Sequence, residues 1–569
     1  MRLQSVIIPQ NTEYPEMYFR GNLSFRAGDM FTLDTYFNSF SYTKYRDFTT
    51  IQTVTFSCKV NGRARLSLCV FDGCEKIISN CDFDGETSLT AKLSELPENG
   101  FLYPKLTALA DCTFINGEYL SDAMPANINV CAAICTYKRE EYVLKNIEKL
   151  RTEDFTYINR IFVIDNGNTL DKQNLSDGII TILENRNYGG SGGFTRGLIE
   201  AKDGGFTHVI LMDDDIDLHP EILERMTVFT SILRTEYQNA HFGTAMLSGS
   251  NPCIQYELGG ANWDGRRVKF VKHNIDIRSP QAMLGNLNGN NIGYGAWWCF
   301  MMPVSDITEY NLPYPFFIKI DDVEYGLRTC KSAPIITMNG IAVRHEDFDN
   351  KYSMHLEYYN VRNQLVMNAV HNNNPTLNAL YRLFAVSFKT LVLYRYDVMP
   401  LILRAFNDYL QGVDFFLSCN EEDLNRELMQ STPRLIPLDE IPEWNENMRN
   451  LPRKSNNKVL TPVALLTMAG HIIPCFLLKK DLSVAPLSRA SAYDTLFRRT
   501  VIQYQLVGNT GIVTKRSFTK YIKYSLNVLA TAVKLLFLSH KVNRDYRTRS
   551  GEITSPEFWR RHLGLINKE

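Results

Sequence analysis

One stretch decides the fold of this chain: Val209-Ile-Leu-Met-Asp213-Asp214-Asp215-Ile216, in which an apolar run leads directly into three consecutive carboxylates. The apolar run predicts a buried strand, with the acids where the chain leaves the sheet. Because side chains alternate along an extended chain, Asp213 and Asp215 point to one side and Asp214 to the other. Two carboxylates on one side suit Mg²⁺ or Mn²⁺. A solvated acidic turn is the alternative interpretation.

Apolar runs upstream of this stretch extend the pattern. Predicted strands at 128–135, 160–164 and 179–183 alternate with helix-like segments. This alternation predicts an α/β fold with a mostly parallel sheet. Ligands of such sheets bind in the crevice outside the carboxyl ends of the strands. Polar residues fall at those ends, namely Thr136, Arg139, Asp165, Asp213 and Asp215.

A glycine-rich run follows the third predicted strand: Asn187-Tyr-Gly189-Gly190-Ser-Gly-Gly193. Four glycines in five residues let the backbone approach a ligand closely and present N–H groups to it. A helix predicted over 194–201 would favour a phosphate at its N-terminus. The run follows the third strand and not the first, so it is not a dinucleotide fingerprint. A flexible surface loop is the alternative.

A second cluster of chemically capable residues lies farther along the chain. Trp297 and Trp298 follow a glycine-rich loop, and in a strand only one of the two rings could line a given pocket. Residues 315–320 predict a strand that ends in Asp321 and Asp322. The alternative for this acid pair is an exposed helix N-terminus, where acids are common.

One histidine stands out because of its position. Residues 340–346 predict a short strand with His345 at its end. A lone histidine is usually structural. At a strand terminus in a domain that already has two acid clusters, His345 is a candidate metal ligand.

The first 125 residues have the pattern of an all-β domain. Apolar and polar residues alternate over 54–60 and 66–70, and Asn61-Gly62 between them is the signal of a two-residue hairpin turn. A β-sandwich is the predicted form. Its role is either to bind carbohydrate or to scaffold an oligomer.

The chain beyond residue 350 is predicted to be helical. Residues 460–478 are apolar enough to suggest a membrane span, but their prolines favour a buried or interfacial hairpin. Residues 481–569 carry 15 Lys and Arg against 6 Asp and Glu, a net charge of +9. This basic charge, interleaved with apolar stretches, suits the anionic cytoplasmic face of a membrane. A helical bundle with a solvated basic face is the alternative.

Composition excludes some classes of protein. The chain has 569 residues, of which 44% are hydrophobic and 22% charged, as in ordinary globular proteins. A formal net charge of −1 gives no overall field that would favour nucleic acid. The N-terminus has no signal-peptide hydrophobic region, and twelve scattered cysteines fit a reducing cytosol.

These features together predict a chemistry. A diphosphate leaving group needs a divalent cation to offset the charge it gains on departure. An acceptor hydroxyl needs a base. With one acid cluster holding the metal and the other supplying the base, the sequence predicts an inverting, metal-dependent glycosyltransferase. The alternatives are a nucleotidyltransferase, which would release pyrophosphate, and a non-catalytic carbohydrate-binding protein.

The sequence also resembles a known family, the family 2 glycosyltransferases of the GT-A fold. Within it, the chain is most similar to the bacterial galactofuranosyltransferases that polymerise galactan. The resemblance covers roughly residues 1–569 and rests on these motifs: Thr136-Tyr-Lys-Arg139, Asn187-Tyr-Gly-Gly-Ser-Gly-Gly193, Met212-Asp-Asp-Asp-Ile216, Trp297-Trp298, Phe317-Ile-Lys-Ile-Asp-Asp322 and Tyr325-Gly-Leu-Arg328. It implies a β-sandwich at 1–125, a GT-A domain at 126–372 and a helical, membrane-associating domain at 373–569.

The resemblance also implies roles for matching residues. Asp213, Asp215 and His345 would bind Mn²⁺ or Mg²⁺. Asp322 would be the general base, with Asp321 and Trp298 holding donor sugar or acceptor. Contacts to the UDP part of the donor are implied for Thr136, Arg139, Asp165, Asn187, Gly189, Gly190 and Asp214.

The implied reaction moves galactofuranose from UDP-galactofuranose to a hydroxyl of a growing cell-surface glycan, free or lipid-linked. The alternative donor is another nucleotide sugar, such as a rhamnose or glucose donor. The implied enzyme is a cytoplasmic homo-oligomer, peripheral on the inner face of the membrane. One departure is Asn360-Val-Arg362-Asn363, where the family has His-Leu-Arg-Asn. An asparagine amide can hydrogen-bond a phosphate or sugar but cannot carry a charge.

Overall fold

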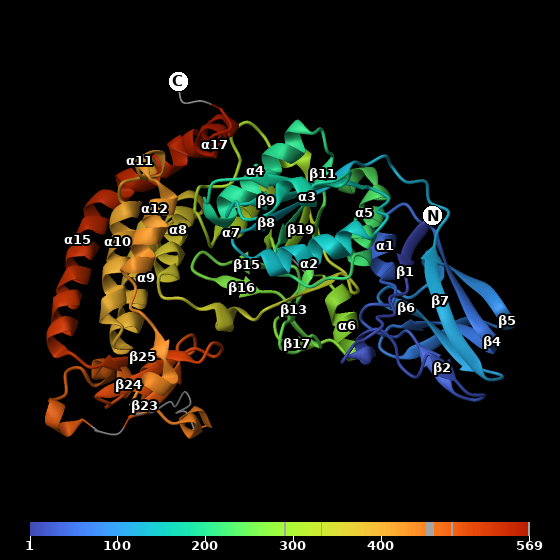
Figure 1. Cartoon of the computed structure of the whole chain (residues 1–569), viewed down its shortest axis with the longest axis horizontal. Helices are drawn as coiled ribbons and strands as arrows, with labels where there is room; N and C mark the ends of the chain where they lie inside the picture. The colour runs from blue at the N-terminus through green and yellow to red at the C-terminus, as the bar shows by residue number, and fades with distance from the viewer. Residues whose placement is uncertain (290–291, 332, 443, 451–459, 479–481, 567–569) are drawn as a thin grey trace. The chain divides into compact units, whose positions relative to one another are not determined.

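The computed structural model describes all residues except 290–291, 332, 443, 451–459, 479–481 and 567–569. The chain divides into two compact units, each built from separate stretches (Figure 1). The first unit comprises Met1–Pro313, Asp322–Glu346 and Arg560–Glu569, and the second comprises Tyr314–Asp321 and Asp347–Trp559. The division into domains at 125 and 372 stays a prediction.

An antiparallel sheet forms the N-terminal part of the first unit. Its strands are β1 (Arg2–Ser5), β2 (Ser24–Phe25), β3 (Met30–Thr32), β4 (Thr53–Phe71), β5 (Glu75–Lys92), β6 (Phe101–Ala108) and β7 (Cys112–Leu120). The strand order is β1-β7-β4-β6-β3, with β2 paired to β7 and β5 to β4. The first half of β4 pairs with β7 and the second half with β6. The predicted all-β region is confirmed.

The hairpin turn predicted at Asn61-Gly62 is wrong. β4 runs through both residues, and its register against β5 shifts between Lys59 and Arg63, as at a β-bulge. Gly62 has a φ of +114°, and a Cβ there would lie 2.3 Å from the carbonyl oxygen of Asp111. The Asn-Gly pair therefore provides a bulge inside one long strand, and only glycine fits at its second position.

The mostly parallel sheet predicted from the sequence lies in the same unit. Its strand order is β10-β9-β8-β11-β19-β12-β20. The strands are β8 (Val130–Thr136), β9 (Ile158–Asp165), β10 (Ile180–Glu184), β11 (His208–Asp213), β12 (His241–Gly243), β19 (Cys299–Pro303) and β20 (Ile335–Ile336). β8 to β11 are mutually parallel where they pair, and β19 runs antiparallel to β11 and β12. The carboxyl ends of β8, β9 and β11 therefore meet at one edge.

Helices and smaller sheets complete the first unit. The helices are α1 (Tyr42–Phe48), α2 (Glu140–Arg151), α3 (Lys172–Leu175), α4 (Gly189–Asp203), α5 (Glu221–Ser231), α6 (Pro280–Leu287) and α7 (Asp321–Thr329), whose first residue belongs to the second unit. One sheet has the order β17-β14-β13-β21, and another the order β16-β15-β18. Their strands are β13 (Ala245–Ser248), β14 (Ile254–Glu257), β15 (Gly260–Trp263), β16 (Val268–Phe270), β17 (Ile275–Asp276), β18 (Tyr294–Gly295) and β21 (Ala342–His345).

A buried ion pair on α5 joins the N-terminal sheet to the rest of the first unit. The Arg225 guanidinium donates to the carbonyl oxygens of Ser5 (2.6 Å), Phe37 (2.6 Å) and Gly340 (3.1 Å). Its Nε lies 3.3 Å from the Glu221 carboxylate, which accepts the Ser5 N–H. Burial lowers the pKa of Arg225, and the charge of Glu221 opposes that shift. Three backbone carbonyls and one carboxylate thus compensate a desolvated cation.

The second unit is mainly helical, and the predicted helical C-terminal region is confirmed. Its helices are α8 (Leu356–His371), α9 (Pro375–Val392), α10 (Met399–Tyr409), α11 (Val413–Ser418), α12 (Glu421–Gln430), α13 (Leu460–Leu466), α14 (Ala492–Thr495), α15 (Phe518–Arg549), α16 (Gly551–Thr554) and α17 (Pro556–His562), which ends in the first unit. It also contains a sheet of β22 (Ile436–Pro437), β25 (Thr510–Lys515), β24 (Thr500–Tyr504) and β23 (Ser483–Pro486), in that order.

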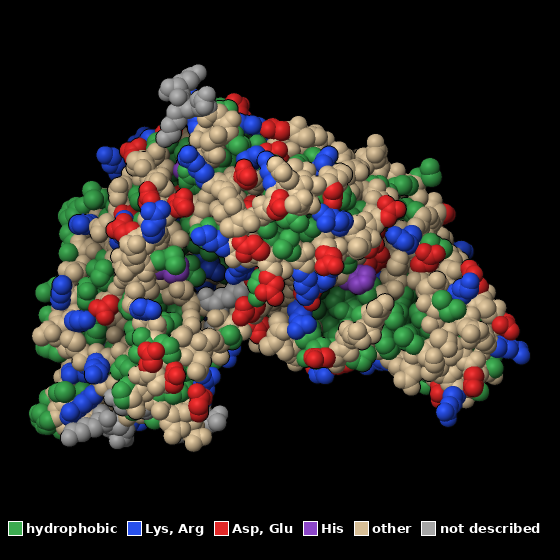
Figure 2. Space-filling view, viewed as in Figure 1, with side chains coloured by type: hydrophobic (Ala, Val, Ile, Leu, Met, Phe, Trp, Pro, Cys, Tyr) green, Lys and Arg blue, Asp and Glu red, His purple; other side chains and the backbone are tan. Residues whose placement is uncertain are grey.

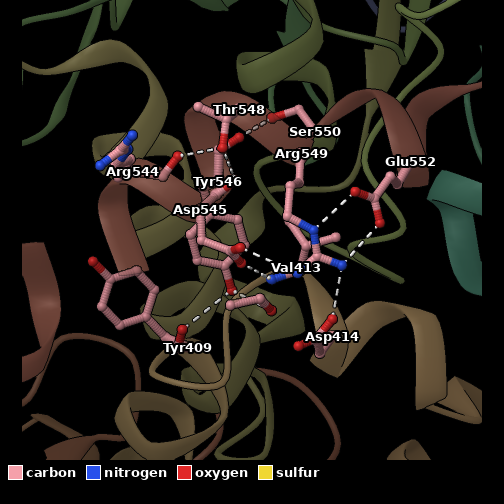
Figure 3. Close-up of polar contacts among 11 residues, drawn as sticks. Tyr409, Val413, Asp414, Arg544, Asp545, Tyr546, Thr548, Arg549, Ser550 and Glu552 are labelled. Atoms are coloured by element: carbon pink, nitrogen blue, oxygen red, sulfur yellow. Dashed lines mark hydrogen bonds and ion pairs between the residues drawn. The ribbon is translucent and has the colours of Figure 1, made fainter. Parts of the chain in front are cut away.

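Ion pairs fix the C-terminal end of α15 to the junction of α10 and α11 (Figure 3). Arg549 binds the carboxylates of Asp414, Asp545 and Glu552 at 2.8, 3.1 and 2.8 Å. Asp545 in turn accepts the Val413 N–H at 2.8 Å. The last turn of this helix is therefore held by three carboxylates.

The strand predicted over 315–320 is wrong. The segment is irregular, with a left-handed φ at Phe317, Lys319 and Ile320. The side-chain amide of Asn363 donates to three of its carbonyl oxygens, those of Phe316, Ile318 and Lys319. An extended segment could not turn successive carbonyls toward one amide, so this long-range contact outweighs the local apolar pattern.

The Arg225 contacts predict a stability effect. Arg225→Met leaves the Glu221 carboxylate buried without its cation. We therefore expect the free energy of unfolding to fall by about 3–5 kcal/mol. Urea denaturation followed by circular dichroism measures the loss. Arg26→Met, at an exposed arginine of the same unit, is the control and should change little. Equal midpoints for the two variants would contradict a bridging role.

Candidate active site

Three predicted ligands meet beside the carboxyl end of β11. Asp213 ends β11, Asp215 follows in the next turn and His345 ends β21. Their ligand atoms all lie within 4.8 Å of one another, and Nε2 of His345 is 3.3 Å from Oδ1 of Asp215. His345 is buried and both carboxylates are partly accessible. Two carboxylates and one imidazole fit Mn²⁺ or Mg²⁺, since these ions accept a small protein ligand set and complete it with water and phosphate.

Backbone pairing fixes these ligands. Asp213 lies opposite Cys135 of β8, and its N–H donates to the carbonyl oxygen of Trp298 at 3.1 Å. His345 pairs with Ser248 on β13. The close approach of these two strands is continued by Gly249, where a Cβ would lie 2.9 Å from the His345 carbonyl oxygen.

Arg139 forms ion pairs with Asp215 and with the neighbouring Asp214. Its Nη1 lies 2.6 Å from Asp215 Oδ2 and 3.3 Å from Asp214 Oδ1. Burial raises the pKa of Asp214, and the charge of Arg139 opposes this. The Asn146 amide holds the backbone of the turn by donating to the carbonyl oxygens of Asp214 and Ile216. Asp214 is not in the group of three possible metal ligands.

Asp165 and Thr136 end neighbouring strands and lie opposite each other in the sheet. Asp165 is fully buried, and its carboxylate accepts N–H groups from Gly167, Thr169 and Leu170 at 2.7–2.9 Å. This residue therefore organises the loop after β9. Its implied contact with UDP stays a prediction, as does that of Thr136.

The glycine run predicted as a loop forms the first turn of a helix. α4 begins at Gly189 and not at residue 194, and Gly189 and Gly190 are partly exposed at its N-terminus. Asn187 accepts the Gly189 N–H at 3.1 Å. A Cβ on Gly193 would lie 2.2 Å from Cys135 Sγ, and one on Gly197 would lie 2.5 Å from a side chain of β8. The glycines therefore let α4 pack closely on the sheet.

Trp297 and Trp298 lie in a turn between β18 and β19, so the predicted strand geometry is wrong there. Their rings nevertheless make separate contacts. Trp298 is buried and its indole N–H donates to the Thr244 carbonyl oxygen at 3.0 Å. The Trp297 ring packs edge-on against Phe194 of α4 and Tyr325 of α7, at 5.2 and 5.7 Å. A sugar contact of Trp298 stays a prediction.

Asp321 and Asp322 are the first two residues of α7, so they occupy a helix N-terminus and not a strand end. Oδ1 of Asp322 accepts the Val323 N–H at 2.8 Å. The helix continues through Tyr325 to Thr329. The two acids lie at the position where a helix dipole stabilises negative charge.

Sequence reasoning missed one acid of this region, Glu257 at the end of β14. It is buried, and burial together with the charge of Asp322 raises its pKa to about 8. The pKa of the Tyr294 hydroxyl is also raised, mainly by burial and further by the negative charges of Asp322 and Glu257. No motif marks Glu257. The available signal was an acid that ends a short alternating strand, Ile254-Gln-Tyr-Glu257.

The segment that departs from the family pattern is structural in the second unit. Arg362 is fully buried and donates to the Phe316 carbonyl oxygen at 2.8 Å. Its guanidinium lies 5.1–5.3 Å from four aromatic rings, those of Tyr358, Tyr359, Phe415 and Phe416. Arg362 and its neighbour Asn363 thus hold the irregular segment before α7, and Asn360 is partly exposed.

Two family models match this chain. One is described as glycosyl transferase family 2 and covers residues 131–229, from β8 through most of α5. The other is described as galactofuranosyltransferase 2 N-terminal and covers residues 5–122, the antiparallel sheet. The chain is a glycosyltransferase, and its residues 131–229 match family 2. The GT-A fold class is confirmed with it, and the match includes Asp213 and Asp215, whereas His345 and Asp322 lie beyond it.

Curated relatives agree with this assignment. The enzyme is 24% identical over 499 residues to the galactofuranosyltransferase GlfT2 of Mycobacterium tuberculosis, covering 79% of this chain and 76% of that protein. It is 24% identical over 444 residues to the GlfT2 of Mycolicibacterium smegmatis, covering 71% and 68%. Among solved structures, mannosyl-3-phosphoglycerate synthase from Rubrobacter xylanophilus matches 42% of this chain and 73% of its own, with 13% identity and a TM-score of 0.26.

The buried Glu257 predicts a pH-dependent stability. The unfolded chain ionises this carboxyl near pH 4.5 and the folded enzyme only near pH 8, so rising pH progressively favours unfolding between these values. Glu257→Gln cannot ionise. We expect its melting temperature to exceed that of the wild type by a margin that grows from pH 4.5 to 8 and then levels off. Thermal unfolding at several pH values measures the margin.

A control separates this effect from general charge removal. Glu86→Gln removes an exposed carboxylate of β5 and should give a margin that stays flat with pH. A flat margin for Glu257→Gln as well would contradict the raised pKa.

Proposed function

We propose that the enzyme transfers galactofuranose from UDP-galactofuranose to a hydroxyl of a growing glycan, with inversion at the anomeric carbon. The observation that carries this proposal is the cluster of Asp213, Asp215 and His345 at adjoining strand ends. Two curated relatives named as galactofuranosyltransferases support the choice of sugar. The match of the N-terminal sheet to the galactofuranosyltransferase 2 model supports it independently of the catalytic sheet.

Asp213, Asp215 and His345 would hold Mn²⁺ or Mg²⁺, which when bound offsets the negative charge that UDP gains on leaving. Arg139 binds Oδ2 of Asp215, and Oδ1 of the same carboxylate faces His345. We assign the remaining UDP contacts to Thr136, Arg139, Asp165, Asn187, Gly189, Gly190 and Asp214. Among these, Gly189 and Gly190 lie at the N-terminus of α4, where a phosphate is favoured, and the Gly189 N–H already donates to Asn187.

Asp322 is the proposed general base. It takes the proton of the acceptor hydroxyl while the oxygen attacks the anomeric carbon and the bond to UDP breaks on the opposite side. The N-terminus of α7 stabilises the negative charge that a base must carry. Asp321 and Trp298 are proposed to hold the donor sugar or the acceptor.

We further propose that the enzyme works at the inner face of a membrane, as a homo-oligomer. Among the described residues, one helix, α15, is long and apolar enough to cross a membrane, and 28% of its most apolar window is buried. One side of α15 packs inside the second unit through Val528, Ala532, Leu535 and Val542. A helix with one side committed to a bundle is placed to lie on a membrane surface, not to span it.

The outer side of α15 has the composition that such a surface needs. It exposes a continuous apolar stripe: Phe518, Ile522, Leu526, Leu529, Val533, Leu536 and Phe537. Figure 2 shows hydrophobic side chains interspersed with Lys and Arg along the edge where Figure 1 places this helix. The segment 466–477 adds exposed Ile472 and Phe476 beside it, because His471 stacks on Tyr521 at 4.5 Å. This apolar, basic surface suits anionic lipid.

Donor and metal dependence test the proposed reaction. We expect UDP release with UDP-galactofuranose and an acceptor oligosaccharide, little release with UDP-glucose or a rhamnose donor, and loss of release in EDTA. Asp322→Asn should lower kcat by about 10²–10⁴-fold and leave UDP and Mn²⁺ binding intact, since only a base would be lost. Asp215→Asn should lose Mn²⁺ binding by calorimetry.

Asp84→Asn, at an exposed carboxylate of β5, is the matched control and should keep both properties. Turnover of Asp322→Asn near that of the wild type would remove Asp322 from the reaction. Activity that survives EDTA would remove the metal.

Vesicle sedimentation tests the membrane surface. The enzyme should bind vesicles rich in phosphatidylglycerol and bind phosphatidylcholine vesicles weakly. Leu529→Glu combined with Phe537→Glu should weaken binding by tenfold or more, since each burial of a large apolar side chain contributes about 1.5–3 kcal/mol. Ile77→Glu, at an exposed apolar residue of β5, should bind like the wild type. Equal sedimentation of all three proteins would refute the assignment.

A further inference from the structure

A cavity of about 930 Å³ lies in the first unit, apart from the three metal-site residues. One wall is the N-terminal segment 9–18, which follows β1. The other wall includes Lys149 of α2, the turn at 217–220 after β11, and Arg344 of β21. Figure 2 shows the surface hollowed below α2, with hydrophobic side chains on the floor of the hollow. Its volume is that of a ligand pocket, and nothing in the proposed reaction uses it.

The cavity shares its backbone with the metal-site residues. Asp217 and Arg344 exchange two backbone hydrogen bonds of 2.8 Å each. Asp217 lies two residues after Asp215, and Arg344 directly precedes His345. Because side chains alternate along β21, Arg344 is exposed while His345 is buried on the other side. A ligand in the cavity would thus lie on the side of β21 opposite to His345.

The charges of the cavity do not favour a nucleotide or other anion. Its two cations are already occupied, since Lys149 binds the Asp217 carboxylate and Arg344 donates to the Gly249 carbonyl oxygen at 2.9 and 3.2 Å. Glu13 and Glu153 add two further carboxylates to the lining. With three acids against two cations, the lining carries a formal net charge of −1. Such a lining repels phosphate and accepts hydrogen bonds from neutral hydroxyl groups.

Aromatic rings in the cavity lining provide the apolar contacts that a sugar-binding site needs in addition to hydrogen-bonding groups. Tyr18 stacks on Phe37 with 4.7 Å between ring centroids and 11° between planes, and Tyr14 lines the same wall. The C–H face of a sugar ring packs on such rings, while its hydroxyls bond to carboxylates and amides. Gln10 and Asn11 bring exposed amides to this wall. Rings, amides and carboxylates in one neutral-to-acidic cavity are the chemistry that recognises an uncharged glycan.

We propose that this cavity is a second glycan-binding subsite, which holds a neutral stretch of the acceptor chain away from the transfer site. The proposal rests on the proposed function only in naming the acceptor as the glycan. Binding there raises the effective concentration of the acceptor end near Asp322 for chains long enough to reach both places. Short acceptors gain nothing from it.

Equilibrium binding tests the subsite without any transfer. A long uncharged galactofuranose oligosaccharide should bind the full-length enzyme in calorimetry with EDTA present and no donor. Asn11→Trp fills the cavity, and Tyr14→Ala removes a ring, so each should weaken binding by about tenfold, as expected for one lost aromatic contact. Asn80→Trp, on exposed β5, is the matched control. Circular dichroism melting of each variant establishes that it is folded.

Kinetics then show whether the subsite serves the reaction. Asn11→Trp should raise KM for the long acceptor by about tenfold and leave kcat and the KM of a disaccharide acceptor unchanged. Equal long-chain binding by the wild type and by both cavity variants would overturn the proposal, as would equal KM changes for long and short acceptors. An enzyme that binds the oligosaccharide but transfers no galactofuranose would refute the proposed function and leave the subsite standing.

Discussion

The constraint on which this enzyme depends is the repulsion among carboxylates at the end of β11. Asp213, Asp214, Asp215 and Asp217 fall within five residues, partly shielded from water. Helix α2 supplies a cation at each end to compensate this negative charge. Arg139 at its N-cap binds Asp214 and Asp215, and Lys149 in its last turn binds Asp217. One helix thus pairs with Asp214, Asp215 and Asp217, and Asp215 also lies 3.3 Å from His345.

Much of this arrangement could be predicted because it follows from short periodic patterns. The apolar runs before Thr136, Asp165 and Asp213 give parallel strands, and parallel strands bring their carboxyl ends to one edge. His345 ends β21, a strand of a separate sheet, so its approach to Asp215 does not follow from this rule. Alternation does not apply to Asp214 and Asp215, because both lie in the turn after β11 and both contact Nη1 of Arg139.

The wrong predictions share a physical cause. At Gly62, at Gly193 and over 315–320, the local pattern was compatible with two structures, and a distant group decided between them: the Asp111 carbonyl, Cys135 of β8 and the Asn363 amide. A glycine in particular indicates that another group packs closely against the backbone, but it does not identify that group. The buried environment of Glu257 and the cavity beside residues 9–18 also depend on tertiary packing. No local sequence motif predicts either of them.

The contacts of Arg225 have a consequence for how this protein can vary over evolution. The guanidinium recognises the main-chain oxygens of Ser5, Phe37 and Gly340, which every amino acid supplies. Side chains at those partner positions can therefore be exchanged while the junction survives, whereas the arginine itself has no substitute with the same fork of donors. The N-terminal sheet can in this way diverge far in sequence yet remain inseparable from the catalytic sheet, as a permanent part of the enzyme and not a detachable module.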